Sequence, residues 1–245
     1  MDALYNARKE KQGRTFPRQF APEWMDAPDL APNRHEAALR GIQRVNFWSR
    51  AHRILWPPIR ELAAEIGRPV RVLDLGCGAG DIAVRLWKTA QRVGVPWEIR
   101  GCDLSPYAVA HAQRRADQHG ANIQFQILDV LHDPLPQNYD VLCASLFLHH
   151  FEWDIACDLL RRMADATQHQ LLINDLVRSR SAYLFAVAGC SLLTRSDVVR
   201  HDGPQSVRSA FTVEEMTTLA TTAGLKDAHI TRHWPYRLRL LWRKQ

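Results

Sequence analysis

The chain lacks any apolar run long enough to cross a membrane, and its cysteines form no C-x-x-C pair. Its longest apolar stretch, Ala182 to Leu193, has about twelve residues, whereas a membrane-spanning helix needs about 20. No N-terminal stretch joins a basic flank to an apolar core, so we expect no signal peptide. The five cysteines are odd in number, which favours reduced core thiols in a cytoplasmic protein without stable membrane insertion.

The 245 residues, of which 46% are hydrophobic, suffice for one domain with additions. The net charge of +6 is concentrated at the two ends, because residues 1–20 contribute +3 and residues 226–245 contribute +5. Basic ends can contact nucleic acid or an anionic membrane, but a solvated strand face and a polar arm are the commoner explanation. We therefore expect no nucleic-acid partner, and the composition is compatible with a homodimer.

One stretch near the middle of the chain combines a strand, a glycine turn and the start of a helix. Residues 70–75 are mostly apolar and predict a buried strand, which Gly76, Gly78 and Gly80 interrupt before an apolar-periodic run begins. Alternate glycines let the backbone turn sharply and approach a ligand closely, while the N–H groups of the following helix offer donors to an anion. This arrangement predicts a cofactor site.

The spacing of the glycines indicates which cofactor binds. The dinucleotide-binding fingerprint is G-x-G-x-x-G, but here the spacing is G-x-G-x-G, and Asp81 stands where that fingerprint has its third glycine. An acid, Asp74, precedes the first glycine by two residues. The pattern resembles the first motif of the class I S-adenosylmethionine (SAM)-dependent methyltransferases, usually written [DE]-x-G-x-G-x-G. A nicotinamide-dependent oxidoreductase is accordingly the weakest alternative.

Three further segments are similar to the next strands of that family, in order: Ile99 to Pro106, Gln124 to Val130 and Tyr139 to Phe151. Asp103 follows Gly80 by 23 residues, about where a ribose-binding carboxylate is expected. The resemblance implies that Asp129 binds the adenine amino group. It implies SAM as the cofactor, with these contacts: Asp74, Gly76, Cys77, Gly78, Gly80, Asp103, Leu104, Asp129, Val130 and Ser145.

Strands alternate with helices between residues 70 and 176, which predicts an α/β protein with a doubly wound, mostly parallel sheet. The family adds a C-terminal antiparallel hairpin, so we expect seven strands. Arg237, Arg239 and Arg243 alternate with apolar residues, so we expect them on a solvated strand face. Ligands of such sheets bind beyond the carboxyl ends of the strands.

The first 64 residues resemble the family hardly at all. We expect a polar arm over residues 1–20, a helix from about His35 that Asn33 or a neighbour caps, and a second short helix over about Ile54 to Ile66 with Pro57 near its start. In the family, such helices often fold over the cofactor. We therefore divide the chain into an N-terminal arm with lid helices (1–64) and a SAM-binding methyltransferase domain (65–245).

A segment inserted after the fifth strand, residues 177–211, contains an apolar helix over Ala182 to Leu193. Substrate-specific elements usually lie at this place in the family, which suggests a pocket for an apolar small molecule. A dimer contact or plain core packing would explain the same pattern. Thr212, followed by two acids, predicts the N-cap of the next helix.

Methyl transfer from a sulfonium depends largely on positioning, and a nearby base helps when the acceptor is a hydroxyl. Histidine is the usual base, and the candidates are His149, His150 and His201. Substrate contacts are expected from three residues: Asp175, Arg178 and Arg208. No cluster of acids matches the metal site of the catechol-type enzymes, so we expect no metal.

The fourth strand ends in Ala144-Ser-Leu-Phe147 in place of the Asn/Asp-Pro-Pro-Tyr/Phe of methyltransferases that act on base amino groups. The Leu-His-His-Phe and Ile-Asn-Asp-Leu segments are closer to the quinone-biosynthesis and small-molecule enzymes. The leading hypothesis is methyl transfer to an oxygen, less favourably a carbon, of an aromatic, polyketide-like or quinone-like molecule. RNA methylation and a catalytically silent SAM-binding module are the alternatives.

Overall fold

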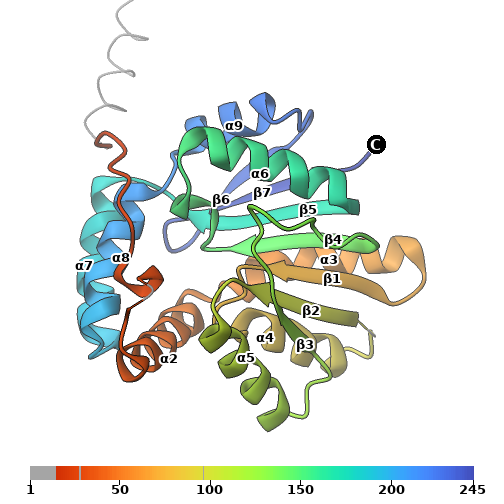
Figure 1. Cartoon of the computed structure of the whole chain (residues 1–245). Coiled ribbons are helices and arrows are strands. Elements are labelled where there is room, and N and C mark those ends of the chain that lie inside the picture. The colour runs from red at the N-terminus through yellow and green to blue at the C-terminus, as the bar shows by residue number, and fades with distance from the viewer. Residues whose placement is uncertain (1–14, 28, 96) are drawn as a thin grey trace, which may run out of the picture.

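The computed structural model describes residues 15–245 except 28 and 96, and its centre is a seven-stranded sheet (Figure 1). The strands lie in the order β3-β2-β1-β4-β5-β7-β6, and β7 alone runs in the direction opposite to the other six. This confirms the predicted doubly wound, mostly parallel sheet. The strands are β1 (Val70–Leu75), β2 (Trp97–Asp103), β3 (Gln124–Ile127), β4 (Tyr139–Ser145), β5 (Thr167–Leu176), β6 (His229–His233) and β7 (Arg237–Arg243).

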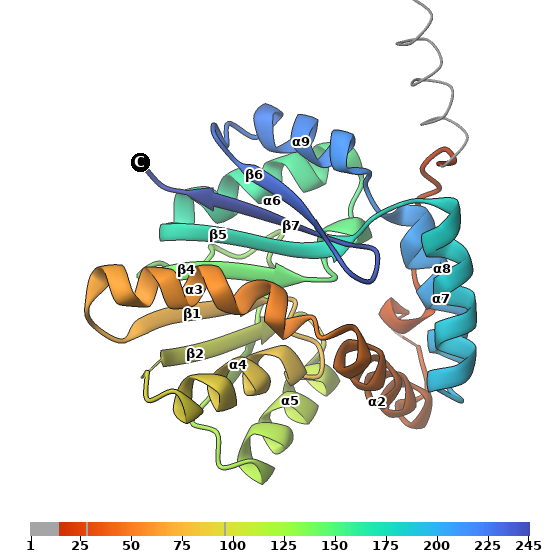
Figure 2. The same ribbon diagram turned by 180° about the vertical axis from the view of Figure 1, so that it is seen from behind.

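Helices cover both faces of the sheet, since the strands are apolar on both sides (Figures 1 and 2). One face carries α3 (His52–Ile66), α4 (Asp81–Arg92) and α5 (Pro106–Gln118). The other carries α6 (Trp153–Ala166) and α9 (Val213–Thr222). Thr212 caps α9 with its side chain as predicted, and Glu215 completes the capping box.

A separate helical layer lies beside the end of the sheet at which the parallel strands finish (Figure 1). It contains η1 (Trp24–Asp26), α2 (Pro32–Ser49), α7 (Arg180–Leu193) and α8 (Asp197–Ser209). The short helix η2 (Leu148–His150) follows β4 and contacts α8. The layer thus joins the N-terminal helices to the insertion, two segments far apart in the sequence.

Both N-terminal helices begin earlier than the sequence suggests. Pro32 occupies the first turn of α2, so Asn33 is not its cap. Helix α3 begins at His52 and carries Pro57 and Pro58 in its interior. A proline there leaves the carbonyl four residues earlier without its helical donor, and Arg239 Nη1 donates to the carbonyl of Ile54.

The C-terminal arginines do not all lie on a solvated strand face, which corrects the expectation from their alternation. Arg243 is exposed and pairs with Glu65. Arg237 is 2% exposed, and its Nη2 donates to Ser49 Oγ at 3.1 Å. Helices α2 and α3 cover the part of β7 that contains Arg237 and Arg239. The alternation of residues within β7 cannot show that helices from elsewhere in the chain cover it.

Within the described part of the chain, no helix combines the length and apolar character of a membrane span. Of the predicted N-terminal arm, residues 1–14 lie outside the described residues. Residues 15–20 are docked, since Arg18 donates to the carbonyls of Phe151 and Ser209.

Candidate functional site

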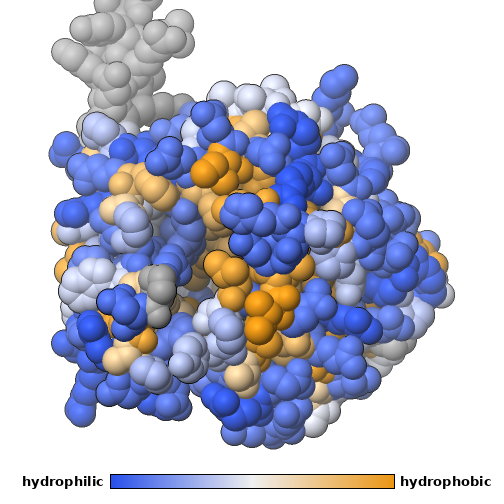
Figure 3. Space-filling view, viewed as in Figure 1, coloured by the Kyte–Doolittle hydropathy of each residue, from blue (hydrophilic) through white to orange (hydrophobic). Residues whose placement is uncertain are grey.

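A cavity of about 1040 Å³ lies where the carboxyl ends of the strands meet the helical layer. Its volume is at the upper end of the roughly 300–1000 Å³ of small-molecule sites, so it has room for a cofactor and a second molecule. Figure 3, which has the viewpoint of Figure 1, shows apolar side chains gathered near the middle of a largely hydrophilic surface. The cavity runs from the glycine turn after β1 to the inner side of α7.

The glycine turn forms one end of the cavity. Gly76 and Gly78 both have positive φ, of 63° and 51°, a region that residues with a Cβ rarely adopt. A Cβ on Gly76 would lie 2.3 Å from the Phe147 ring, whereas a Cβ on Gly78 would meet nothing within 4 Å. The backbone at Gly78 is therefore open to a ligand in the cavity.

Asp103, at the end of β2, is bound to the glycine turn. Its carboxylate accepts hydrogen bonds from the backbone N–H of Gly78 at 2.8 Å and of Ser105 at 2.9 Å. Burial raises the pKa of Asp103. Each carboxylate oxygen keeps a free lone pair, so Asp103 can also accept hydrogen bonds from two neighbouring hydroxyls.

Of the ten cofactor contacts expected from the sequence, nine line the cavity; Gly80 does not. A Cβ on Gly80 would meet Ala112 at 2.8 Å, which indicates a packing role against α5. Asp129 is held at the cavity by Leu131 N–H and His132 Nδ1. The hydrogen bond with His132 lowers the pKa of Asp129.

Two buried acids, Asp74 and Asp81, lie beneath the glycine turn. Burial and the negative charge of Asp81 raise the pKa of Asp74 from 3.8 to about 7. Burial also raises the pKa of Asp81, against the opposing effects of Arg115 and of the hydrogen bond from Asn46 Nδ2. The folded protein therefore resists ionisation of Asp74.

We expect Asp74→Asn to stabilise the ligand-free protein at pH 8 and to have little effect near pH 4. A raised folded-state pKa imposes no penalty below the unfolded value of 3.8; the penalty develops as the pH rises to about 7 and is complete above it. The shift in the pKa of Asp74 from 3.8 to about 7 corresponds to at most about 4 kcal/mol in the free energy of unfolding. Urea unfolding of both proteins between pH 4 and pH 8 measures it, with exposed Asp158→Asn as the control. An equal difference between Asp74→Asn and the wild type at both pH values would contradict the prediction.

His149, in the short helix η2 after β4, lines the cavity and is 2% exposed. Its Nδ1 is 2.7 Å from Asp175 Oδ1, and its Nε2 is 3.4 Å from Glu23 Oε1. Burial alone would lower the pKa of His149, but Asp175 and Glu23 outweigh burial and raise it to about 10. Asp175 does not line the cavity; it positions His149 from behind.

His150 repeats this arrangement one residue further along η2. Its Nδ1 is 2.9 Å from Asp26 Oδ2, and its Nε2 is 3.8 Å from Glu23 Oε2. The rings of His149 and His150 are 4.4 Å apart. The N-terminal segment around η1 therefore brings two carboxylates to the two histidines that follow β4.

The structure does not bring the other three predicted residues to the cavity. His201 stacks on Trp24, with ring centroids 3.8 Å apart, and its Nδ1 contacts Asp202. Arg178 is buried in an ion pair with Glu215. Its Nε and Nη1 also donate to backbone carbonyls. Arg208 packs over the Tyr183 ring and donates to its hydroxyl, so neither arginine is placed to bind an anion in the cavity.

Glu23 and Arg237 are among the cavity residues that were not predicted from the sequence. Glu23 lies in a proline-punctuated connector that has no periodic signal. Arg237 lies in a strand whose alternation predicted solvent. Burial lowers the pKa of Arg237 to about 10, and its Nη1 has no hydrogen-bond partner among the described residues. It can donate to an anionic group of a ligand.

The far wall of the cavity is largely apolar. One side of α7 faces inward with residues at helical spacing: Ala182, Phe185, Ala186, Gly189, Cys190 and Leu193. Leu184 is 66% exposed on the opposite side of the helix. The wall favours an apolar molecule, held between α7 and the polar groups of η2.

Comparisons of the sequence and of the fold with known proteins find methyltransferases. Residues 72–170 match the family model described as a methyltransferase domain. A demethylmenaquinone methyltransferase of Thermus thermophilus is 32% identical over 84 residues, which are 34% of this chain and 36% of that protein. A ubiquinone biosynthesis O-methyltransferase of Paraburkholderia phytofirmans is 25% identical over 162 residues, which are 65% of this chain and 66% of that protein.

The chain thus spans less than two thirds of the length of these curated relatives. Among solved structures, the SAM-dependent methyltransferase SibL superposes with a TM-score of 0.64 at 17% identity, covering 97% of this chain and 68% of SibL. A likeness at this identity concerns the fold, and it extends over the N-terminal helices and the insertion.

Proposed function

Residues 72–170 match the model of a methyltransferase domain, and from this premise we propose that the protein is a SAM-dependent methyltransferase that methylates a hydroxyl oxygen of an apolar, aromatic or quinone-like small molecule. The observation that carries the proposal is the composition of one cavity. We assign the glycine turn and Asp103 to one end of it. The other end is formed by the apolar wall of α7 and by the side chains of Glu23, His149 and His150.

The cofactor is assigned to the end with the glycine turn. Asp103 accepts the ribose hydroxyls there, and Asp129 lies at the expected position for the adenine. Arg237 donates from Nη1 to the carboxylate of the methionine part, because this buried guanidinium nitrogen has no hydrogen-bond partner among the described residues and favours an anion. Of the proposed lid segment, residues 1–64, η1 and α2 line the same cavity, so these two helices are the parts that would cover the cofactor.

The acceptor is assigned to the space between α7 and η2. The hydroxyl lies beside Glu23 and His149. Glu23 accepts its proton, and His149, which stays protonated near neutral pH because its pKa is raised to about 10, holds that carboxylate in place. The oxygen then forms a bond to the methyl carbon of SAM as the carbon–sulfur bond breaks and the electron pair returns to sulfur. The products are the methyl ether, S-adenosylhomocysteine and one proton.

Two observations favour an oxygen in a small molecule over the alternatives. A ubiquinone biosynthesis O-methyltransferase is among the relatives, and the strand end lacks the motif of base amino-group methylation. The basic C-terminus supports RNA methylation less than its charge suggests, because Arg237 is buried and Arg239 is half-buried over α3.

A methyl-transfer assay with isotopically labelled SAM tests the function. We expect transfer to members of a panel of alkyl-substituted phenols and hydroquinones, with mass spectrometry placing the added methyl on oxygen. S-adenosylhomocysteine should inhibit in competition with SAM. Product formed only on RNA, or only on carbon, would overturn the proposed acceptor; binding of SAM without any product would favour a silent module.

A further inference from the structure

The side chains of Glu23, His149 and His150 converge on one point at the wall of the cavity. One ligand atom of each residue lies within 4.8 Å of the others. Glu23 Oε1 is 3.4 Å from His149 Nε2, and Glu23 Oε2 is 3.8 Å from His150 Nε2. Two imidazole nitrogens and a carboxylate therefore surround a small volume without closing it by short hydrogen bonds.

The other nitrogen of each ring is held by a carboxylate. His149 Nδ1 contacts Asp175, and His150 Nδ1 contacts Asp26. A carboxylate on one ring nitrogen orients the ring and, once a metal ion has displaced the proton of the other nitrogen, directs the lone pair there, as in the carboxylate–histidine–metal arrangement of metalloproteins. Ser206 donates a hydrogen bond to Glu23 Oε1 and orients that carboxylate in turn.

The spacing of the ligand atoms fits a transition-metal ion. Bonds of 2.0–2.1 Å in a tetrahedral site place neighbouring ligand atoms roughly 3.3–3.4 Å apart, which is the separation of His149 Nε2 from Glu23 Oε1. His150 Nε2 is 3.8 Å from the other oxygen of the same carboxylate, Glu23 Oε2, so a small rotation of the ring and of the carboxylate would bring it to a ligand distance. Calcium and magnesium prefer oxygen ligands, whereas two imidazoles and one carboxylate suit zinc and its neighbours.

We propose that Glu23, His149 and His150 form a binding site for one divalent transition-metal ion of the zinc type, with an open coordination position facing the cavity. Two histidines and one glutamate are the protein ligands of several catalytic zinc sites, in which the fourth position takes water or substrate. All three residues line the cavity. The proposal replaces the sequence-based expectation of no metal, which considered only clusters of acids.

The consequence for the reaction rests on the proposed function. A hydroxyl oxygen of the acceptor would occupy the open position, where the ion acidifies it and the proton leaves to solvent before methyl transfer. Glu23 and His149 would then act through the ion. The metal site itself is argued from the cluster alone, so its test needs no acceptor.

Calorimetry and elemental analysis test the site on the full chain. After treatment with a chelator and its removal, the wild type should bind one Zn²⁺ per chain with micromolar or tighter affinity, and Mg²⁺ should give no comparable heat. Co²⁺ in the same site should show the visible absorption of tetrahedral Co²⁺. Failure to bind one Zn²⁺ per chain would overturn the proposal.

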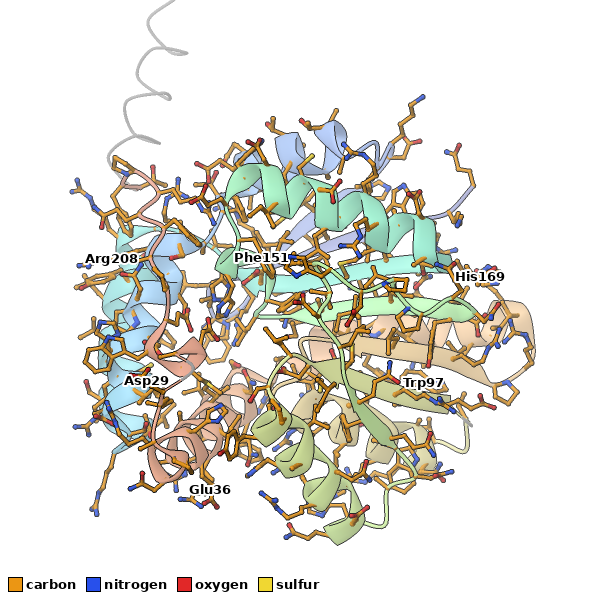
Figure 4. All side chains as sticks on the ribbon, viewed as in Figure 1. Asp29, Glu36, Trp97, Phe151, His169 and Arg208 are labelled. Carbon is orange, nitrogen blue, oxygen red and sulfur yellow. The ribbon has the colours of Figure 1, made fainter. Side chains whose placement is uncertain are left out.

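Variants locate the ion. His150→Ala and Glu23→Gln should each weaken Zn²⁺ binding by at least 10-fold to 100-fold and abolish the Co²⁺ spectrum. His169→Ala is the matched control, because His169 also faces a carboxylate, that of Asp140. His169 lies at the opposite end of the sheet from Phe151, the residue that follows His150 (Figure 4). Unchanged Zn²⁺ affinity in both cluster variants would overturn the site.

S-adenosylhomocysteine binding provides the control for folding and for the proposed function. The cluster variants should bind it with wild-type affinity, because the glycine turn and Asp103 are untouched. Stoichiometric zinc binding by a protein that binds no S-adenosylhomocysteine would support the metal site and contradict the proposed methyl transfer. A protein that binds the cofactor and is active, but contains no zinc by metal analysis and binds none, would support the proposed methyl transfer and contradict the metal site.

Discussion

Asp103→Ala should weaken binding of SAM and of S-adenosylhomocysteine by roughly 100-fold to 10,000-fold. A carboxylate that accepts hydrogen bonds from two ribose hydroxyls makes two charge-assisted bonds of about 1.5–3 kcal/mol each, and every 1.4 kcal/mol is tenfold in affinity. The same change also releases the N–H of Gly78 from its bond with Asp103, so the glycine turn loses its support. Isothermal titration of both ligands measures the effect.

Two further variants separate these contributions. Asp103→Asn keeps an oxygen that can accept from Gly78 N–H but lacks the charge, so we expect an intermediate loss. Asp158→Ala removes an exposed aspartate from α6 and should leave the affinity unchanged. Wild-type affinity in Asp103→Ala, in a protein with an unchanged circular dichroism spectrum, would show that the cofactor does not bind at the end of β2.

His149→Asn should lower the rate of methyl transfer by a factor of roughly 100 to 10,000, the range for removal of a group that handles a proton. Asparagine can keep a donor near the position of Nδ1 and so retain the hydrogen bond to Asp175, but it has no group at the position of Nε2. Alanine is less suitable, because it would leave the buried Asp175 charge without its partner. Single-turnover kinetics with an accepted phenol or hydroquinone measure the effect.

The contrast with cofactor binding makes this result specific. His149→Asn should bind S-adenosylhomocysteine within about threefold of the wild type, since the side chain of His149 contacts Asp175 and Glu23 and neither the glycine turn nor Asp103. His169→Ala, far from the cavity, should keep the full rate. A His149→Asn protein that transfers methyl groups at the wild-type rate would remove the η2 histidines from the reaction.

The cofactor end of the site was predictable because its elements are contiguous in the chain. A strand, three glycines and a helix start follow each other within residues 70–92, and each later acid ends a strand of its own. Parallel strands place those ends at one edge of the sheet, so local patterns also predict their proximity. The doubly wound, mostly parallel sheet was predicted from the same repetition of strands and helices.

The polar cluster at the acceptor end depends on contacts that no local pattern encodes. Asp26 is separated by 124 residues from His150, and Asp175 by 26 residues from His149. The sequence alone made His149 one candidate among three. Tertiary packing separated them, because it placed His149 and His150 against Glu23 and stacked His201 on Trp24 instead.

The amino-acid sequence by itself determined the order of strands and helices, the glycine turn and the acids around it, because hydrophobic period and backbone freedom act over a few residues. Tertiary structure alone decided the environment of each charged side chain. Arg178 is paired with Glu215, Arg237 is buried with a free donor, and Glu23 reaches the cavity. Burial and partnership of a charge depend on segments that meet only in the folded chain, and that is why the chemistry of the acceptor end appears only there.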